Sequence, residues 1–230
     1  MKNFRTILLV VLVATLAKPY TVKAQEEEEK ESPFSVGADL VSSYVWRGVK
    51  YGGPSLQPYV EFGVGGFAIG AWGSFDFTYM DLAVNEADLY AGYGFNFGLY
   101  VGVTDYYYQG SPYFKYDSDS ASHAIEGNLA YEIGGFSISA NYIFNDARNG
   151  AGSQGGDMYF EAGYAFKNFE VFVGAGDGWH TTDGDFGLVN IGIGASKEIK
   201  ITEKYSLPIS GQVILNPEAE QFHVVAAISF

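Results

Sequence analysis

The chain has 230 residues, of which 47% are hydrophobic and 17% aromatic, and its formal net charge is −14 at pH 7. Such an acidic chain disfavours binding to nucleic acid, whose phosphates attract Lys and Arg. The absence of cysteine excludes disulfide bonds, thiolate metal sites and cysteine nucleophiles.

The N-terminal region has the pattern of an export signal. Lys2 and Arg5 precede an apolar run over residues 7–17, which is too short to span the ~30 Å of a bilayer's hydrocarbon core. This pattern predicts a signal peptide over residues 1–24. Residues 25–33 contain five glutamates and have little apolar surface to bury, which predicts an acidic, disordered tether. Residues 34–230 then form a single domain.

Beyond the tether, apolar residues recur at every second position, between clusters of Gly, Asn, Asp and Ser. This period is typical of β-strands, and we expect about twelve strands, within a range of roughly ten to fourteen. The runs begin near Ser35, Gln57, Phe67, Glu86, Leu99, His123, Phe136, Asp157, Phe169, Leu188, Ser206 and Gln221. The predicted fold is all-β, an antiparallel transmembrane up-and-down β-barrel.

The chemistry of the two strand faces favours a membrane barrel over a soluble one. In one strand Phe136, Ile138 and Ala140 share a face without charge, and the opposite face carries Ser137 and Ser139. Lys and Arg, which a water-facing exterior would need, are almost absent from the strands. The pattern therefore predicts an exterior in lipid and a polar interior.

The connections alternate between tight and long, as in a meander through a membrane. Tight turns are expected near residues 65–66, 96–98, 134–135 and 167–168, and long loops over 78–85, 108–121, 145–156 and 176–187. The usual asymmetry of such barrels places the turns in the periplasm and the loops outside. The predicted location is the bacterial outer membrane. Lipids and lipopolysaccharide would be its partners there, and the last strand, with Phe230, resembles the signal that the barrel-assembly machinery reads.

One stretch carries a family resemblance. Ser43-Tyr44-Val45-Trp46-Arg47-Gly48-Val49, followed by a Gly-Pro loop and the strand that starts at Gln57, is similar to the opening of the TorF-type porins, largely uncharacterised outer-membrane proteins of Gram-negative bacteria. The resemblance implies an outer-membrane location and a pore-like barrel, and it carries over no catalytic residue.

The inner face is expected to be acidic, with Arg47 as its one strand-borne base. The candidate lumen-lining residues are Asp39, Arg47, Glu61, Trp72, Asp76, Glu86, Asp88, Glu126, Glu161 and Glu170. In a water-filled lumen such carboxylates favour cations. The alternative is a structural plug of hydrogen-bonded carboxylates and tyrosines. For Arg47 the expected acceptors are Asp39 and Glu61.

Glycines also fall on the predicted inner face, at positions such as Gly70, Gly92 and Gly174. They either clear a passage or leave notches for the large side chains on the same face, among them Trp72 and Tyr100.

Residues for catalysis or metal binding are not predicted. The three histidines, His123, His180 and His223, show no pairing with a serine of the kind that acyl hydrolases use. The loop over residues 177–185 is acidic but lacks the spacing of a helical calcium loop. We therefore expect no enzyme activity, no cofactor and no metal site.

The leading functional prediction is a porin-like channel for passive diffusion of small polar or cationic solutes. The alternative is a structural or adhesive barrel that does not conduct, with loops over residues 108–121 and 176–187 that bind a lipid, an ion or a partner.

Overall fold

The computed structural model describes residues 32–78, 85–117, 121–148, 150–203 and 205–230. The predicted signal peptide, and all of the predicted tether except Ser32 and Pro33, lie outside the described residues. Within the described residues, no helix has the length and apolar character that crossing a membrane requires.

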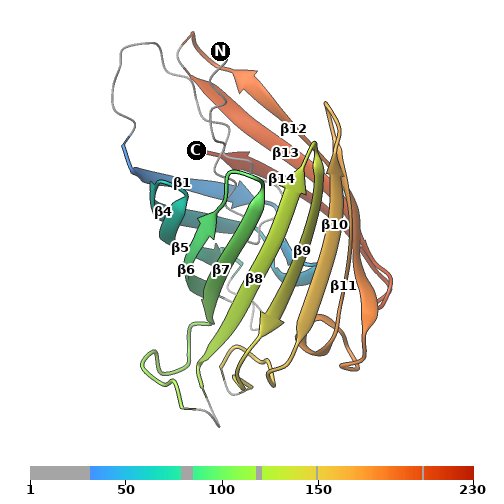
Figure 1. Ribbon diagram of the computed structural model, residues 1–230. Coiled ribbons are helices and arrows are strands. Elements are labelled where there is room, and N and C mark those ends of the chain that lie inside the picture. The colour runs from blue at the N-terminus through green and yellow to red at the C-terminus, as the bar shows by residue number, and fades with distance from the viewer. Residues whose placement is uncertain (1–31, 79–84, 118–120, 149, 204) are drawn as a thin grey trace.

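Twelve strands form one closed antiparallel barrel in which neighbours in sequence are neighbours in space (Figure 1). They are β1 (Phe34–Val41), β4 (Ser55–Val64), β5 (Phe67–Asp76), β6 (Glu86–Gly94), β7 (Leu99–Tyr107), β8 (His123–Ile133), β9 (Phe136–Ile143), β10 (Met158–Ala165), β11 (Glu170–Gly176), β12 (Gly187–Lys200), β13 (Ser206–Asn216) and β14 (Gln221–Ser229). The barrel closes where β1 pairs with β14, with Leu40 opposite Ile228. The predicted fold class is confirmed, and each predicted strand start lies within two residues of the observed one.

Two short strands between β1 and β4 are not part of the barrel wall. β2 (Tyr44–Trp46) and β3 (Val49–Gly52) pair only with each other, as a two-stranded sheet. We call this segment, residues 44–52, the inner hairpin.

The two faces of the wall differ as the alternation predicts. In β5, the outward Phe67, Ile69 and Phe75 are 39–49% exposed, whereas the inward Trp72 and Ser74 are at most 8% exposed. The same contrast recurs in β9 and β10, where Ile138 and Phe160 are exposed. An exterior of exposed aliphatic and aromatic side chains is that of a barrel embedded in lipid.

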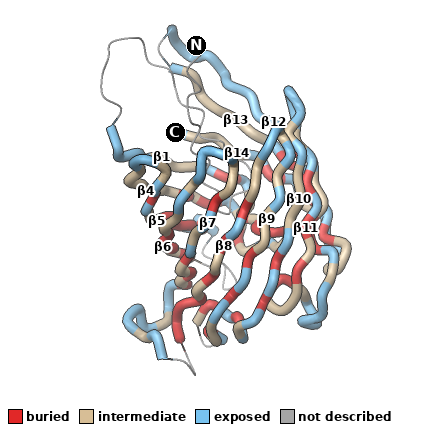
Figure 2. The backbone as a smooth tube through the Cα atoms, viewed as in Figure 1, coloured by how far each residue is buried: buried red, intermediate tan, exposed pale blue. Residues whose placement is uncertain are grey.

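The two ends of the barrel also differ. The turn end carries tight connections, the start of β1, the C-terminal Phe230 and two glycine pairs with positive φ, Gly65-Gly66 and Gly134-Gly135, which suit two-residue hairpin turns (Figure 1). The loop end carries the inner hairpin and the longer connections that follow β5, β7, β9 and β11. Buried residues gather in the half of the barrel next to the loop end (Figure 2).

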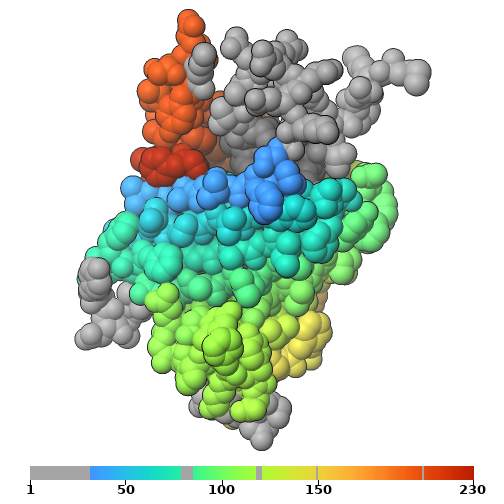
Figure 3. Space-filling view, turned by 90° about the vertical axis from the view of Figure 1, so that its left-hand side faces the viewer, coloured from blue at the N-terminus to red at the C-terminus, as the bar shows by residue number. Residues whose placement is uncertain are grey.

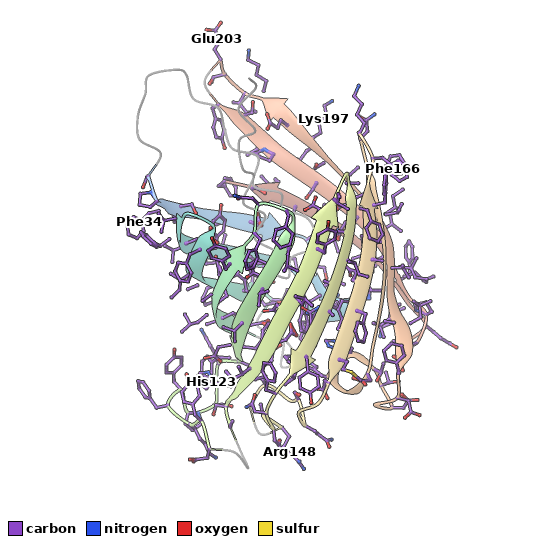
Figure 4. The ribbon with its side chains drawn as sticks, in the orientation of Figure 1. Phe34, His123, Arg148, Phe166, Lys197 and Glu203 are labelled. Carbon is purple, nitrogen blue, oxygen red and sulfur yellow. The ribbon has the colours of Figure 1, made fainter. Side chains whose placement is uncertain are left out.

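One hairpin rises above the rim at the turn end. β12 and β13 pair as far as Lys200 opposite Ser206, whereas β11 pairs with β12 only up to Gly194. Lys197 and Glu203 therefore lie beyond the barrel, at the same end as Phe166, while His123 and Arg148 lie at the other (Figure 4).

Inward glycines provide space for large rings that lie along the wall. A Cβ on Gly92 would lie 2.2 Å from the Tyr100 hydroxyl oxygen, and one on Gly174 would lie 2.1 Å from that of Tyr159. Gly70 stands in the same relation to Tyr90. At these three positions the glycines therefore leave space for large side chains of the inner face, which is one of the two roles that the sequence predicts.

Candidate functional site

The inner hairpin folds into the loop-end half of the barrel, where it forms hydrogen bonds and ring contacts with residues of several strands. At its tip Arg47 and Gly48 have positive φ values of 49° and 81°, which reverse the chain. Gly48 is required there, because a Cβ would lie 1.8 Å from the Val189 carbonyl oxygen. The prediction that Arg47 lies on the first barrel strand is therefore wrong, since β1 ends at Val41.

The guanidinium group of Arg47 meets Glu126 of β8 across the bore. Arg47 Nη1 donates to Glu126 Oε2 at 2.7 Å, and Nη2 donates to Oε1 at 2.8 Å. Both side chains are at most 5% exposed. The predicted acceptors, Asp39 and Glu61, are wrong, because the hairpin moves Arg47 away from the wall that carries them.

Aromatic rings enclose this ion pair. The Arg47 Cζ atom lies 4.4 Å from the ring centroids of both Trp46 and Tyr159, which is within the range of cation–π attraction. Trp46 also contacts Tyr106 and Trp179, at centroid distances of 5.3 and 5.2 Å. The charge is thus surrounded by rings as well as paired.

The loop between β11 and β12 holds the hairpin from the side through a single 3₁₀ turn, Gly178–His180. Trp179 Nε1 donates to the Tyr51 hydroxyl oxygen at 2.6 Å. Burial, together with the nearby charge of Arg47, lowers the pKa of His180 well below its ordinary value. The imidazole is therefore neutral, and its Nε2 lies 3.4 Å from Arg47 Nη1, where it accepts a weak hydrogen bond.

A chain of polar side chains continues from Glu126 along the inner wall. Glu126 Oε1 also accepts from the Tyr106 hydroxyl at 3.2 Å and from Asn128 Nδ2 at 2.6 Å. Further round, the Tyr159 hydroxyl and Asn190 Nδ2 donate to Glu161 Oε2, at 2.5 and 2.9 Å. The side chains of this region therefore form hydrogen bonds mainly with one another.

The other predicted site residues lie at three places. Near the loop end, Glu86 and Asp88 are at most 3% exposed, and Glu86 accepts a hydrogen bond from the hairpin's Tyr44 hydroxyl at 2.7 Å. Trp72 packs against Tyr44, with centroids 5.6 Å apart. Asp76 binds the rim instead, where it accepts from the backbone N–H groups of Gly53 and Thr78. Asp39, Glu61, Glu161 and Glu170 are half-buried on β1, β4, β10 and β11.

Several members of this cluster were not among the predicted site residues, namely Trp46, Tyr51, Tyr106, Trp179 and His180. The available signal was Gly48 directly after Arg47, which marks a turn in what otherwise reads as a strand. The partners on β7 and on the β11–β12 loop have no such signal, because their contacts join residues more than 50 positions apart in the sequence.

No catalytic or metal-binding arrangement is seen among these groups. Within the described ranges, no three or more His, Cys, Asp or Glu side chains are grouped to hold a metal ion. The hydrogen bonds of His123 and His180 go to Asp105, to the Tyr113 carbonyl and to Arg47, rather than to a serine hydroxyl.

Solved structures similar to this one include porins. The KdgM porin in complex with disordered oligogalacturonate is 10% identical, with a TM-score of 0.45, over 85% of this chain and 96% of that one. A double mutant of the Rh. blastica porin is 16% identical, with a TM-score of 0.44, over 86% and 73%. A five-substitution mutant of that porin is 15% identical, with a TM-score of 0.41, over 76% and 55%, so the chain spans about half of its length. No curated protein matches the sequence.

A family model matches most of the chain. Its description reads "Bacterial protein of unknown function (Gcw_chp)", and the match covers residues 27–206, which include the inner hairpin, Glu126 and His180. This match does not bear on the TorF label, which stays a prediction. The chain belongs to the Gcw_chp family of bacterial proteins of unknown function.

Proposed function

We propose that the protein is an outer-membrane channel of the porin type, through which small polar or cationic solutes diffuse passively. The observation that carries this proposal is the contrast between an apolar, lipid-compatible exterior and an interior with half-buried carboxylates, among them Glu61 and Glu161. The resemblance to TorF-type porins fits the same function.

The charge balance of the wall supports a preference for cations. Among the described residues of the twelve barrel strands, Lys and Arg occur only as Lys197 and Lys200, on the extension beyond the rim. Glu61 and Glu161 are half-buried on the inner face, where Glu61 accepts a hydrogen bond from the neutral hydroxyl of Tyr90 and Glu161 accepts from the neutral Tyr159 and Asn190. Carboxylates in such a bore attract cations and repel anions.

The inner hairpin determines the width of the path. Because Arg47 reaches from the connection between β1 and β4 to β8 on the opposite wall, the hairpin occupies the bore near the loop end. We infer a narrow channel that admits small solutes only, with Arg47 neutralised by Glu126 at its tightest level.

Conductance in planar lipid bilayers tests this function. The refolded protein should give stepwise currents, and a salt gradient should give a reversal potential of the sign for cation selectivity. The double variant Glu61→Gln, Glu161→Gln should shift this potential toward zero, because it removes two negative charges from the bore. The matched control Glu203→Gln, on the extension, should leave the potential unchanged.

A second candidate function, a barrel that does not conduct, is favoured by the bonding of the inner hairpin, which resembles a packed core. Its signature would be a silent bilayer containing protein that still shows heat-modifiable migration on gels. That result would contradict the channel. The location in the outer membrane and the contacts with lipopolysaccharide and the barrel-assembly machinery belong to both proposals.

A further inference from the structure

Two ionisable side chains, Asp105 and His123, form a pair on the outer face of the barrel, beside residues that face the lipid. In β7, Val101 and Val103 point outward and are 46% and 43% exposed, and the alternation places Asp105 and Tyr107 on the same face. His123 pairs with Tyr107 in the sheet, and its Nδ1 lies 2.8 Å from Asp105 Oδ1. Ionisable groups on the outer wall of a membrane barrel are costly unless they are shielded.

The connection after β7 supplies this shield. Residues 109–117, here called the outer-wall loop, fold back so that His123 is only 1% exposed. The ring of His123 stacks on Tyr116 and Tyr107, at centroid distances of 4.1 and 5.0 Å, and Tyr113 meets its edge at 5.0 Å. The Tyr116 hydroxyl donates to Asp105 at 3.3 Å.

The outer surface of the loop is itself aromatic. Phe114 is 90% exposed, Tyr116 53% and Tyr113 39%. These residues lie next to the lipid-facing valines of β7 rather than over the bore, and the corresponding region forms a knob below the wall in the space-filling view (Figure 3). Tyrosine and phenylalanine at the edge of an apolar band are typical of the level of lipid headgroups.

We propose that the outer-wall loop is an interfacial anchor that binds the headgroup region of the lipid leaflet at the loop end. Phe114 enters the lipid, and the hydroxyl groups of Tyr113 and Tyr116 remain among the headgroups and Asp105. The continuity of this aromatic surface with the lipid-facing wall selects lipid as its occupant. The proposal rests on the membrane location in the proposed function, but not on conduction.

Tryptophan fluorescence in vesicles of brominated phosphatidylcholine tests the anchor. Of the three native tryptophans, Trp46 and Trp72 are at most 8% exposed, and Trp179 packs against Trp46 and Tyr106 in the interior, which leaves a low quenching background. The variant Phe114→Trp should lose most of its added emission in lipid brominated close to the headgroup, and less in lipid brominated deep in the acyl chain. The matched variant Leu129→Trp, on the lipid-facing wall, should show the reverse order.

Each other outcome overturns the anchor in a distinguishable way. Quenching of Leu129→Trp without quenching of Phe114→Trp would leave the barrel in the membrane and the loop in water. Absence of quenching in both would remove the membrane location as well. Because the chain has no cysteine, Phe114→Cys provides a single thiol, and efficient crosslinking between two copies without quenching of Phe114→Trp would assign the surface to a chain–chain contact.

Discussion

Arg47 lies inside the barrel at the tip of the inner hairpin. The groups around its guanidinium determine which substitutions at this position the fold tolerates. Its guanidinium group has a carboxylate in bidentate contact, two ring faces at 4.4 Å and a neutral histidine at 3.4 Å. A pair this deeply buried gains little over apolar residues of the same volume, but removal of one partner leaves the other charge uncompensated. Each of the two side chains, Glu126 and Arg47, therefore compensates the buried charge of the other.

Removal of this charge should destabilise the fold. We expect Arg47→Ala to lower the free energy of unfolding by about 3 to 5 kcal/mol, because Glu126 would stay buried without a cation. The measurement is the urea midpoint of the protein folded in detergent micelles. Arg148→Ala is the control, since Arg148 pairs with Asp146 on an exposed loop. Equal midpoints for the two variants would contradict the structural role of the pair.

The double variant Arg47→Met, Glu126→Leu separates the effect of an unpaired buried charge on stability from the effect of lost side-chain volume. Replacing both partners by apolar residues should recover part of the stability that Arg47→Ala loses, because it removes the unpaired charge but also removes the acceptor of the Tyr106 hydroxyl and of Asn128 Nδ2.

At the scale of elements, the twelve barrel strands were predictable because an apolar residue at every second position repeats over seven or more residues in each of them. The inner hairpin was not predictable in this way. Its strands have only three and four residues, and Tyr44 and Trp46 continue the alternation of the strand before them. The same limit applies to the site: the identity of inward carboxylates follows from the period, but the pairing of Arg47 with Glu126 depends on how far the hairpin reaches.

The hairpin should control conductance. We expect that replacing residues 43–53 by a two-residue Asn-Gly turn leaves the barrel closed, because Val41 already pairs with Ser55, and raises the single-channel conductance several-fold. Bilayer recording measures the change. The control is an equivalent shortening of the tip of the β12–β13 hairpin, whose described residues lie beyond the rim at the turn end. Unchanged conductance in the first variant would show that the hairpin does not limit flow.

In the proposed function the whole molecule has two solvents, lipid outside and water within the acidic part of the bore. Leu129, near the middle of β8, is 48% exposed to the outer solvent, and Ser139 of β9 lies on the inner face opposite Ala130. The same residue introduced at these two positions should therefore have very different effects.

Arginine is the most sensitive probe of this difference. We expect Leu129→Arg to cost about 2 to 4 kcal/mol in folding free energy in vesicles, the range for arginine on the lipid face near the bilayer midplane. Ser139→Arg should cost much less, since a wet interior solvates the charge. Reversible folding in vesicles, followed by urea titration, compares the two. An equally large cost at Ser139 would mean that the interior is dry, and would contradict the channel.

The inner hairpin has a mechanical consequence as well. It is bonded to β6 through Tyr44, to β8 through Arg47, to the β11–β12 loop through Tyr51, and to Asn216 of β13 through the Gly48 carbonyl. These four attachments join the hairpin to different sides of the barrel wall. The cross-section of the barrel at the loop end therefore cannot flatten without stretching one of these hydrogen bonds. Among the described residues, the strand segments nearer the turn end carry no comparable crossing segment, so the resistance to flattening that these attachments provide acts on the loop-end rim.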